Sequence, residues 1–268
     1  MGSSEEDKPL RRIAASFEEL AGVAKQQPPG AMEVGSFARA CSHVSVLFGC
    51  LGIAFKFAEM DYVAKARRRR HSPLSSPSPL SESTPRAFAS SRFQNCCLDR
   101  ARCCLDQLNC LLDVVDDLLE TSKTISTLPD MVELDIQNGT VRQAGSHARN
   151  LLRVKRGIDM VKILFEQILA TEGNSLRDAA SKAYAQVFAP HHGWAIRKAV
   201  AIGMYALPSK SQLLKKLNED ESSAKVQMQN FIRSSGPVIL YAEDLFTSRN
   251  LGMDCVHSFA HSCANQQQ

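Results

Sequence analysis

Aromatic residues, glycine and proline are scarce in this chain, and a long hydrophobic run is missing. The 268 residues include one Trp, 14 Gly and 11 Pro, and aromatic residues make up 6%. Long stretches without glycine or proline favour helices over sheets. The longest apolar stretch, Val44–Phe55, is interrupted by Ser45, Gly49 and Gly52, and it falls short of the ~20 residues that a membrane span needs. These absences predict an all-α protein that contacts membranes only at their surface.

The first residues also lack the apolar core of a secretory signal, since Met1–Gln27 is mostly polar and charged. We therefore expect a cytoplasmic location and free thiols at the nine cysteines. Five cysteines lie close together but without the CxxC pairs of a zinc site, so we expect no metal. They are Cys96, Cys97, Cys103, Cys104 and Cys110.

The net charge of +4 comes from one unusual segment. Residues 66–114 hold eight Arg and four acidic residues, so the rest of the chain sums to zero. The run Arg67–Arg70 is compatible with nuclear localisation or an RNA contact, but no aromatic residues are interleaved with it. A solvated charge run is the favoured interpretation, and we expect no nucleic-acid partner.

Apolar spacing predicts about eight helices and no strand. Pro9 precedes the first helix, and Gly236–Pro237 is expected to separate the last two. The predicted helices are Leu10–Ala24, Met32–Lys65, a stretch from Cys96, Thr140–Ala170, Ser175–Phe188, Trp194–Leu207, Ser209–Asn218, Ser222–Ser234 and Val238–Asn250.

One segment interrupts this helical pattern. Ser72–Ser91 is rich in Ser and Pro, without periodicity, and such a composition buries too little apolar surface to order itself. We expect disorder over 66–93 and a helix over 94–114, where Leu and Cys recur every seven residues. The prediction is a single domain over 1–254 with this interruption, followed by a disordered tail over 255–268.

Two charged residues extend an apolar helix face. Leu47, Cys50 and Phe57 lie on that face, and Asp61 and Lys65 follow on it. One interpretation is that the helix simply becomes exposed there, with an ion pair worth a few tenths of a kcal/mol. The other is a polar site at the mouth of an apolar cavity.

The predicted helix Thr140–Ala170 carries three arginines opposite a clean apolar stripe. Arg149, Arg153 and Arg156 share their face with Leu152 and Met160, so the helix is apolar on both sides and is expected to lie between layers. Arginines in a partly buried face need an anion, and the guanidinium fork suits phosphate oxygens. A solvated basic face is the alternative.

The segment from His191 to Trp194 has several interpretations. Adjacent histidines point in different directions and are poor joint metal ligands. His192 has the chemistry to donate a hydrogen bond to a carbonyl group, and Trp194 suits a membrane interface. Either residue is equally compatible with a core or turn position.

Three stretches resemble the glycolipid transfer protein superfamily, in its ceramide-1-phosphate transfer branch. They are Phe57–Lys65, Arg149–Gly157 and Tyr184–Trp194, and the resemblance covers roughly Pro9–Lys65 and Val115–Asp254. It implies a two-layer helical sandwich that carries a sphingolipid, with no cofactor and no catalytic residue.

The resemblance also implies roles for individual residues. Asp61 accepts hydrogen bonds from the ceramide amide and hydroxyl, and His192 donates to the amide carbonyl. Lys65, Arg149 and Arg153 bind the phosphate. The sugar-binding branch has Asn and Trp in place of Lys65 and Arg149, so the phosphate lipid is expected. Trp194 matches a residue at the membrane-docking surface.

The 49 residues 66–114 have no counterpart in the family, and we hypothesise that they are translated non-coding sequence. Two other functions stay open. One is a lipid-sensing interaction protein that regulates programmed cell death without bulk transfer. The other is a hydrolase that uses Asp61 and His192, although no nucleophile lies in a recognisable elbow.

Overall fold

The computed structural model describes residues 8–26, 29–51, 109–143 and 145–252. Within these ranges the chain forms nine α-helices and two short 3-10 turns, and no strand. The helices are α1 (Pro9–Ala24), α2 (Val34–Leu51), α6 (Asn109–Thr121), α7 (Leu128–Gln137), α8 (His147–Ala170), α9 (Arg177–Val187), α10 (Trp194–Gly203), α11 (Lys210–Lys216) and α12 (Glu221–Thr247).

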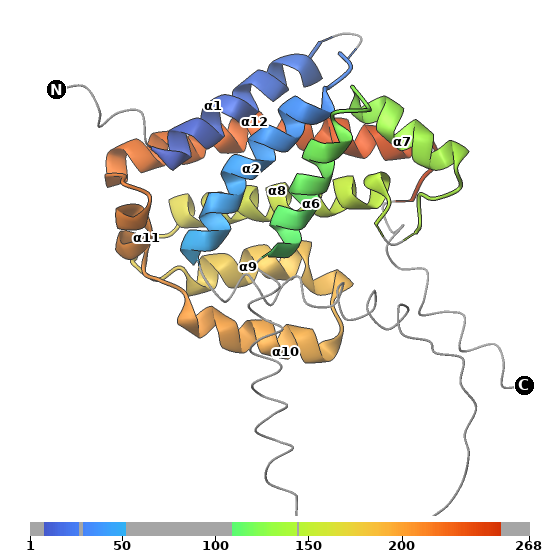
Figure 1. Ribbon diagram of the computed structural model, residues 1–268. Helices are drawn as coiled ribbons and strands as arrows, with labels where there is room; N and C mark the ends of the chain where they lie inside the picture. The colour runs from blue at the N-terminus through green and yellow to red at the C-terminus, as the bar shows by residue number, and fades with distance from the viewer. Residues whose placement is uncertain (1–7, 27–28, 52–108, 144, 253–268) are drawn as a thin grey trace, which may run out of the picture.

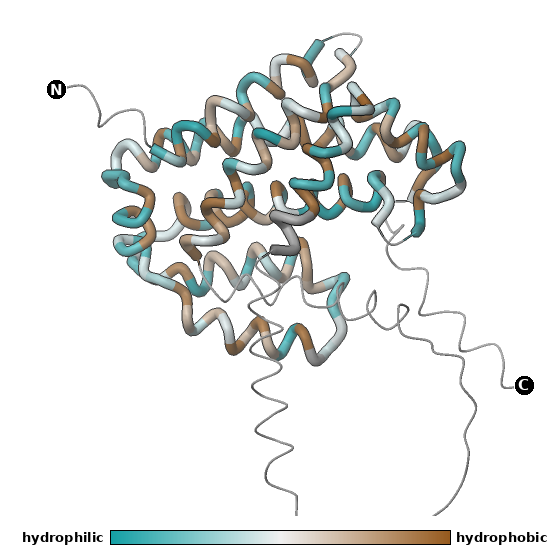
Figure 2. Tube along the Cα trace, viewed as in Figure 1, coloured by the Kyte–Doolittle hydropathy of each residue, from teal (hydrophilic) through white to brown (hydrophobic). Residues whose placement is uncertain are grey.

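The helices form two layers, as predicted. Helices α1, α2 and α6 are neighbours in one layer, and α12, α8 and α9 are neighbours in the other (Figure 1). Helix α7 lies against one end of α8, and α11 contacts α2. Figure 2 shows hydrophobic and hydrophilic segments alternating along the helices, which is the pattern of helices with one face in a core.

Helix α8 is the centre of the structure and is buried on two faces. It lies between α12 and α9, and α2 and α6 cover it. Leu151, Leu152, Met160 and Val161 are each at most 1% exposed although they point in different directions around the helix. The prediction that this helix is buried on both sides is therefore confirmed, although α8 lies within one of the two layers and not between them.

Three aromatic rings join the layers at the core. The ring of Phe231 on α12 meets Phe17 of α1 edge to face at 4.9 Å between centroids, and Phe165 of α8 at 5.5 Å. Such arrangements contribute about 0.5–1.5 kcal/mol beyond the buried area. They fix α12 between α1 and α8.

Helix α12 corrects one prediction. It runs without a break from Glu221 to Thr247, with Pro237 inside it, where we predicted two helices. A proline inside a helix costs about 3 kcal/mol, because it removes a backbone donor and its ring clashes with the preceding turn. Phe231 and Val238, on either side of the proline, are fully buried against the core, and this packing keeps the two halves in one helix.

The structure also corrects the predicted start of the helix Thr140–Ala170. This helix, α8, begins at His147 and not near Thr140, because Gly145 has a φ of +85° and Ser146 caps the helix. Helix α7 was not predicted, although Thr127 and Pro129 form a regular helix start. The predicted helix from Trp194 ends as an α-helix at Gly203 and continues to Ala206 as a 3-10 turn.

Several predictions fall outside the described residues. They include residues 52–65 of the predicted second helix, the disorder over 66–93, the helix over 94–108 and the tail over 255–268. Residues 109–114 of the predicted helix are helical, as the first part of α6.

Helix α2 is the one described helix that is long and apolar enough to cross a membrane. One of its faces lies in the core, where Val34, Phe37 and Leu47 are at most 1% exposed. A helix buried in a protein core can have the same length and hydropathy as a membrane-spanning helix. The buried face of α2 is the feature of a core helix.

Candidate functional site

The arginines of the predicted anion site stand on the first two turns of α8. Arg149 is the third residue of the helix, and Arg153 follows one turn later; both side chains are half-buried. A helix N-terminus carries about half a positive charge, which the carboxylate of Asp135 offsets here by accepting the N–H of Ala148. The attraction for an anion therefore comes from the arginine side chains themselves. Arg156, one turn further, is 7% exposed.

Other elements of the chain fix this start of α8. The hydroxyl of Ser146 accepts the backbone N–H of Arg149 at 3.2 Å. Asp135 of α7 accepts the N–H of Ala148 at 2.7 Å with one carboxylate oxygen and the hydroxyl of Thr140 at 2.7 Å with the other. Asp135 is 5% exposed, so a buried carboxylate of a neighbouring helix caps α8.

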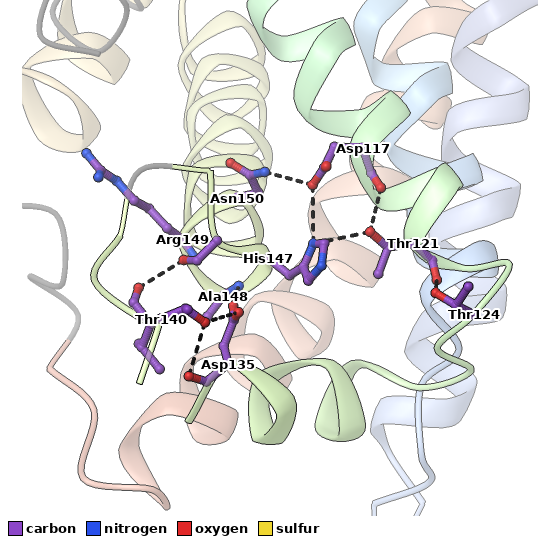
Figure 3. A network of polar contacts seen from close by, with 11 residues as sticks. Asp117, Thr121, Thr124, Asp135, Thr140, His147, Ala148, Arg149 and Asn150 are labelled. Atoms are coloured by element: carbon purple, nitrogen blue, oxygen red, sulfur yellow. Dashed lines mark hydrogen bonds and ion pairs between the residues drawn. The ribbon is translucent and has the colours of Figure 1, made fainter. Parts of the chain in front are cut away.

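Helix α6 supplies a second carboxylate. The Asn150 side-chain amide donates to Asp117 at 2.8 Å, and the Nδ1 of His147 lies 3.4 Å from the same oxygen and 3.2 Å from the hydroxyl of Thr121. Figure 3 shows this group on one side and the Arg149 side chain extending away from it. We call Asp117, Asp135 and Ser146, with their partners, the α8 start.

Lys155, another basic residue of this helix, belongs to a different group. Its ammonium lies 2.6 Å from Asp159 and 2.5 Å from Glu243 of α12. Burial alone would lower the pKa of Lys155, but the hydrogen bonds to Asp159 and Glu243 outweigh it and raise the pKa. Lys155 is thus an ion-paired residue that joins α8 to α12.

Next to Arg153 along α8, the two layers meet in an apolar seam. Its lining comes from three helices: Cys41, Val44 and Phe48 of α2, Val115 of α6, and Val154, Gly157 and Ile158 of α8. The gap between them is about 10 Å³, roughly the space of one water. Burial raises the pKa of the Cys41 thiol, so this cysteine is a neutral part of the lining.

A larger cavity, of about 510 Å³, lies at the opposite end of α8, among Ile168, Gly173, Leu214 and Met228. Arg149 and Ile168 are 19 residues apart on one helix, which corresponds to about 28 Å along its axis. This cavity is therefore separate from the arginines.

His192 lies just beyond α9, which packs along α8. Its Nδ1 is 2.9 Å from the hydroxyl of Tyr184 on α9, and its ring stacks on Phe188 with 5.8 Å between centroids and 15° between planes. The residue is 5% exposed, so the imidazole is held in one orientation.

Helix α10 presents an exposed face that begins at Trp194. Trp194, Ile202 and Tyr205 are 69%, 73% and 70% exposed, and Lys198 between them is exposed too. Their spacing of four, four and three residues places them along one side of the helix and the turn that follows it. The guanidinium of Arg177 lies 4.0 Å above the Tyr205 ring.

The structure describes three of the five residues that were predicted to bind the headgroup. Arg149 and Arg153 share one face of α8, and His192 follows α9, the helix that packs along α8. Asp61 and Lys65 are outside the described residues. In the part of the chain that the structure describes, no cluster of three His, Cys, Asp or Glu could hold a metal ion. Three further residues of the site, Asp117, Asp135 and Tyr184, were not predicted from the sequence. Of these, Tyr184 lies in one of the three stretches that resemble the family.

Comparisons with known proteins agree with this geometry. Residues 108–219 match the family model described as glycolipid transfer protein (GLTP). The chain is 51% identical to Accelerated cell death 11 of Arabidopsis thaliana over 255 residues, which cover 95% of this chain and all of that protein. It is 29% identical to a ceramide-1-phosphate transfer protein of Danio rerio over 49% of this chain and 66% of that protein.

Solved structures show the same fold. A crystal structure of an aspartate-to-asparagine mutant of Arabidopsis ACD11, complexed with C12 ceramide-1-phosphate, matches with a TM-score of 0.71 and 50% identity, covering 93% of this chain and 100% of that one. Mouse ceramide-1-phosphate transfer protein matches with a TM-score of 0.60 at 19% identity, covering 90% and 97% of the two chains. The second likeness concerns the fold alone.

Proposed function

Because this chain belongs to the glycolipid transfer protein family, we propose that it moves a sphingolipid with a phosphate headgroup, of the ceramide-1-phosphate type, between membranes. A relative of 50% identity was crystallised with ceramide-1-phosphate. The observation that carries the proposal is the pair Arg149 and Arg153 on a central helix with two buried faces. Cationic forks in such a position favour a phosphate over a sugar.

In this proposal the headgroup lies over the first turns of α8. Arg149 and Arg153 bind the phosphate oxygens, and Lys65 adds a third positive charge. Asp61 accepts from the amide and hydroxyl of the ceramide, and His192 donates to its carbonyl. Transfer breaks no bond, so we assign no catalytic residue.

The lipid chains are proposed to enter the seam next to Arg153. Its lining is apolar and comes from both layers, so separation of α2 and α6 from α8 would open a space between them. Each buried CH₂ contributes about 0.8 kcal/mol. The gap of about 10 Å³ is far smaller than an acyl chain, so we expect the seam to widen on binding.

Membrane contact is proposed for the exposed face of α10. Trp194, Ile202 and Tyr205 offer apolar groups, and the neighbouring Lys198 suits an anionic lipid surface. The protein would then be cytoplasmic and touch membranes only while it loads or releases a lipid.

Transfer of fluorescent lipids between vesicles tests the proposal. We expect transfer of ceramide-1-phosphate and little transfer of galactosylceramide. The double variant Arg149→Ala/Arg153→Ala should lose at least about tenfold in the rate for the phosphate lipid, since each charge-assisted contact is worth roughly 1.5–3 kcal/mol. Arg233→Ala is the control, because Arg233 is exposed on α12 and donates a hydrogen bond to Asn230, one turn away on the same helix. Wild-type transfer by the double variant, or equal transfer of both lipids by the wild type, would refute the assignment.

A further inference from the structure

The Tyr184–His192 pair has a geometry that bears on which imidazole nitrogen carries the proton. The tyrosine oxygen is 2.9 Å from Nδ1, and both residues are buried, at 7% and 5% exposed. Phe188 stacks on the ring nearly parallel to it. The ring therefore keeps one orientation, with Nδ1 toward the tyrosine and Nε2 on the opposite edge.

We propose that Tyr184 is a positioning residue for His192: its hydroxyl donates to Nδ1 and so fixes the tautomer in which Nε2 carries the hydrogen. A neutral imidazole has one N–H, and the bond made by one nitrogen decides the state of the other. A phenol is a good donor to a neutral ring nitrogen, and the opposite assignment would leave Nε2 without its hydrogen.

The tautomer matters for the lipid, and here the inference rests on the proposed function. The amide carbonyl of a ceramide accepts hydrogen bonds and donates none. An Nε2–H edge binds it, whereas an Nε2 lone pair repels it. Tyr184 would thus determine whether His192 can bind the amide at all, without touching the lipid itself.

Nitrogen NMR of the ligand-free full chain, labelled at histidine, tests the tautomer directly. The chain has seven histidines, and the His192 signals are identified as those missing from His192→Ala. We expect an unprotonated Nδ1 and a protonated Nε2, with the Nδ1 signal moving in Tyr184→Phe, which keeps the ring and removes the hydroxyl. A protonated Nδ1 in the wild type, or unchanged His192 signals in Tyr184→Phe, would overturn the proposal.

Lipid affinity provides the second readout. Tyr184→Phe should weaken binding of a short-chain ceramide-1-phosphate roughly 3- to 10-fold, the worth of one hydrogen bond, and should cause no further loss in a His192→Ala background. The same loss in both backgrounds would mean that Tyr184 does not act through His192. Tyr241→Phe is the matched control, because the hydroxyl of this buried tyrosine bonds to the N–H of Met32 at 3.1 Å and not to His192. The lipid affinity of this variant should equal that of the wild type.

The two proposals fail in distinguishable ways. If the wild type binds no phosphate sphingolipid, the proposed function is wrong, while the NMR result still decides the tautomer. If the wild type binds the lipid but Nδ1 carries the hydrogen, the positioning role of Tyr184 is wrong and the proposed function stands.

Discussion

The α8 start and the seam are neighbours on one helix and are built in opposite ways. At the α8 start, Asp135 uses both carboxylate oxygens in hydrogen bonds of 2.7 Å, and Asp117 binds Asn150 at 2.8 Å. In the seam the contacts are between apolar groups, with a small gap among them. Hydrogen bonds are directional, and apolar contacts are not.

The difference suggests a division of tasks within the proposed function. In that proposal a headgroup of one shape would meet Arg149 and Arg153 on a backbone that the hydrogen bonds of the α8 start hold in place. Acyl chains differ in length, and a seam held by non-directional contacts can repack around them at small cost. The polar end of the site would thus select the headgroup, and the apolar end would accept acyl chains of different lengths.

The largest expected effect comes from breaking the α8 start. Asp135→Ala leaves the N–H of Ala148 without its acceptor and leaves the hydroxyl of Thr140 only the backbone carbonyl of residue 135, at 3.3 Å. We expect a loss of about 3 kcal/mol in the free energy of unfolding. Urea denaturation measures it. Asp130→Ala, at an exposed aspartate that accepts from Thr127, should cost less than about 1 kcal/mol; equal losses would mean that the buried carboxylate has no special role.

A smaller effect is expected from filling the seam. Val44→Phe places a ring in the gap and should weaken binding of long-chain ceramide-1-phosphate about tenfold, the equivalent of roughly two buried CH₂ groups. Short-chain lipid should bind almost as before. Val46→Phe, on the same helix but 43% exposed, should leave both affinities unchanged. A parallel loss for both chain lengths would place the chains elsewhere.

The smallest effect is expected outside both regions. Trp194→Ala removes an exposed apolar group from α10 and should reduce vesicle binding and transfer rate roughly three- to fivefold, as loss of one partly inserted aromatic group would. Lipid affinity in solution should not change. Val226→Ala, half-exposed on α12, is the matched control. An unchanged transfer rate in Trp194→Ala would exclude this face as the docking surface.

The helices were largely predictable from sequence because their apolar spacing is regular. Leu10, Ile13, Phe17 and Leu20 mark α1, and all four are buried. The errors arise where tertiary packing overrides a local signal. Pro237 stays within α12 because the core holds both sides of it, and α8 starts late because Gly145 and Ser146 form a turn and a cap.

The candidate site was predictable only in part. Arg149 and Arg153 stood out because they are charged residues on an otherwise apolar face. Asp117 and Asp135 gave no such signal, since their partners Asn150 and Ala148 are 33 and 13 residues away, and a pairing over that distance leaves no periodic pattern. Tyr184 was nearer to being found, eight residues before His192, but a tyrosine on a buried helix face looks like any core residue.

The position of Asp117, Asp135 and Ser146 in the chain has a consequence for how the protein tolerates changes of length. All three follow residue 108, and they set the start of α8 through bonds formed among α6, α7 and α8 themselves. The residues that form the start of α8 and carry the two arginines therefore all lie within 109–153, about one sixth of the chain. Insertions or deletions between α2 and α6 change the length of the chain that precedes these arginines, but they remove none of the hydrogen bonds that set the start of α8.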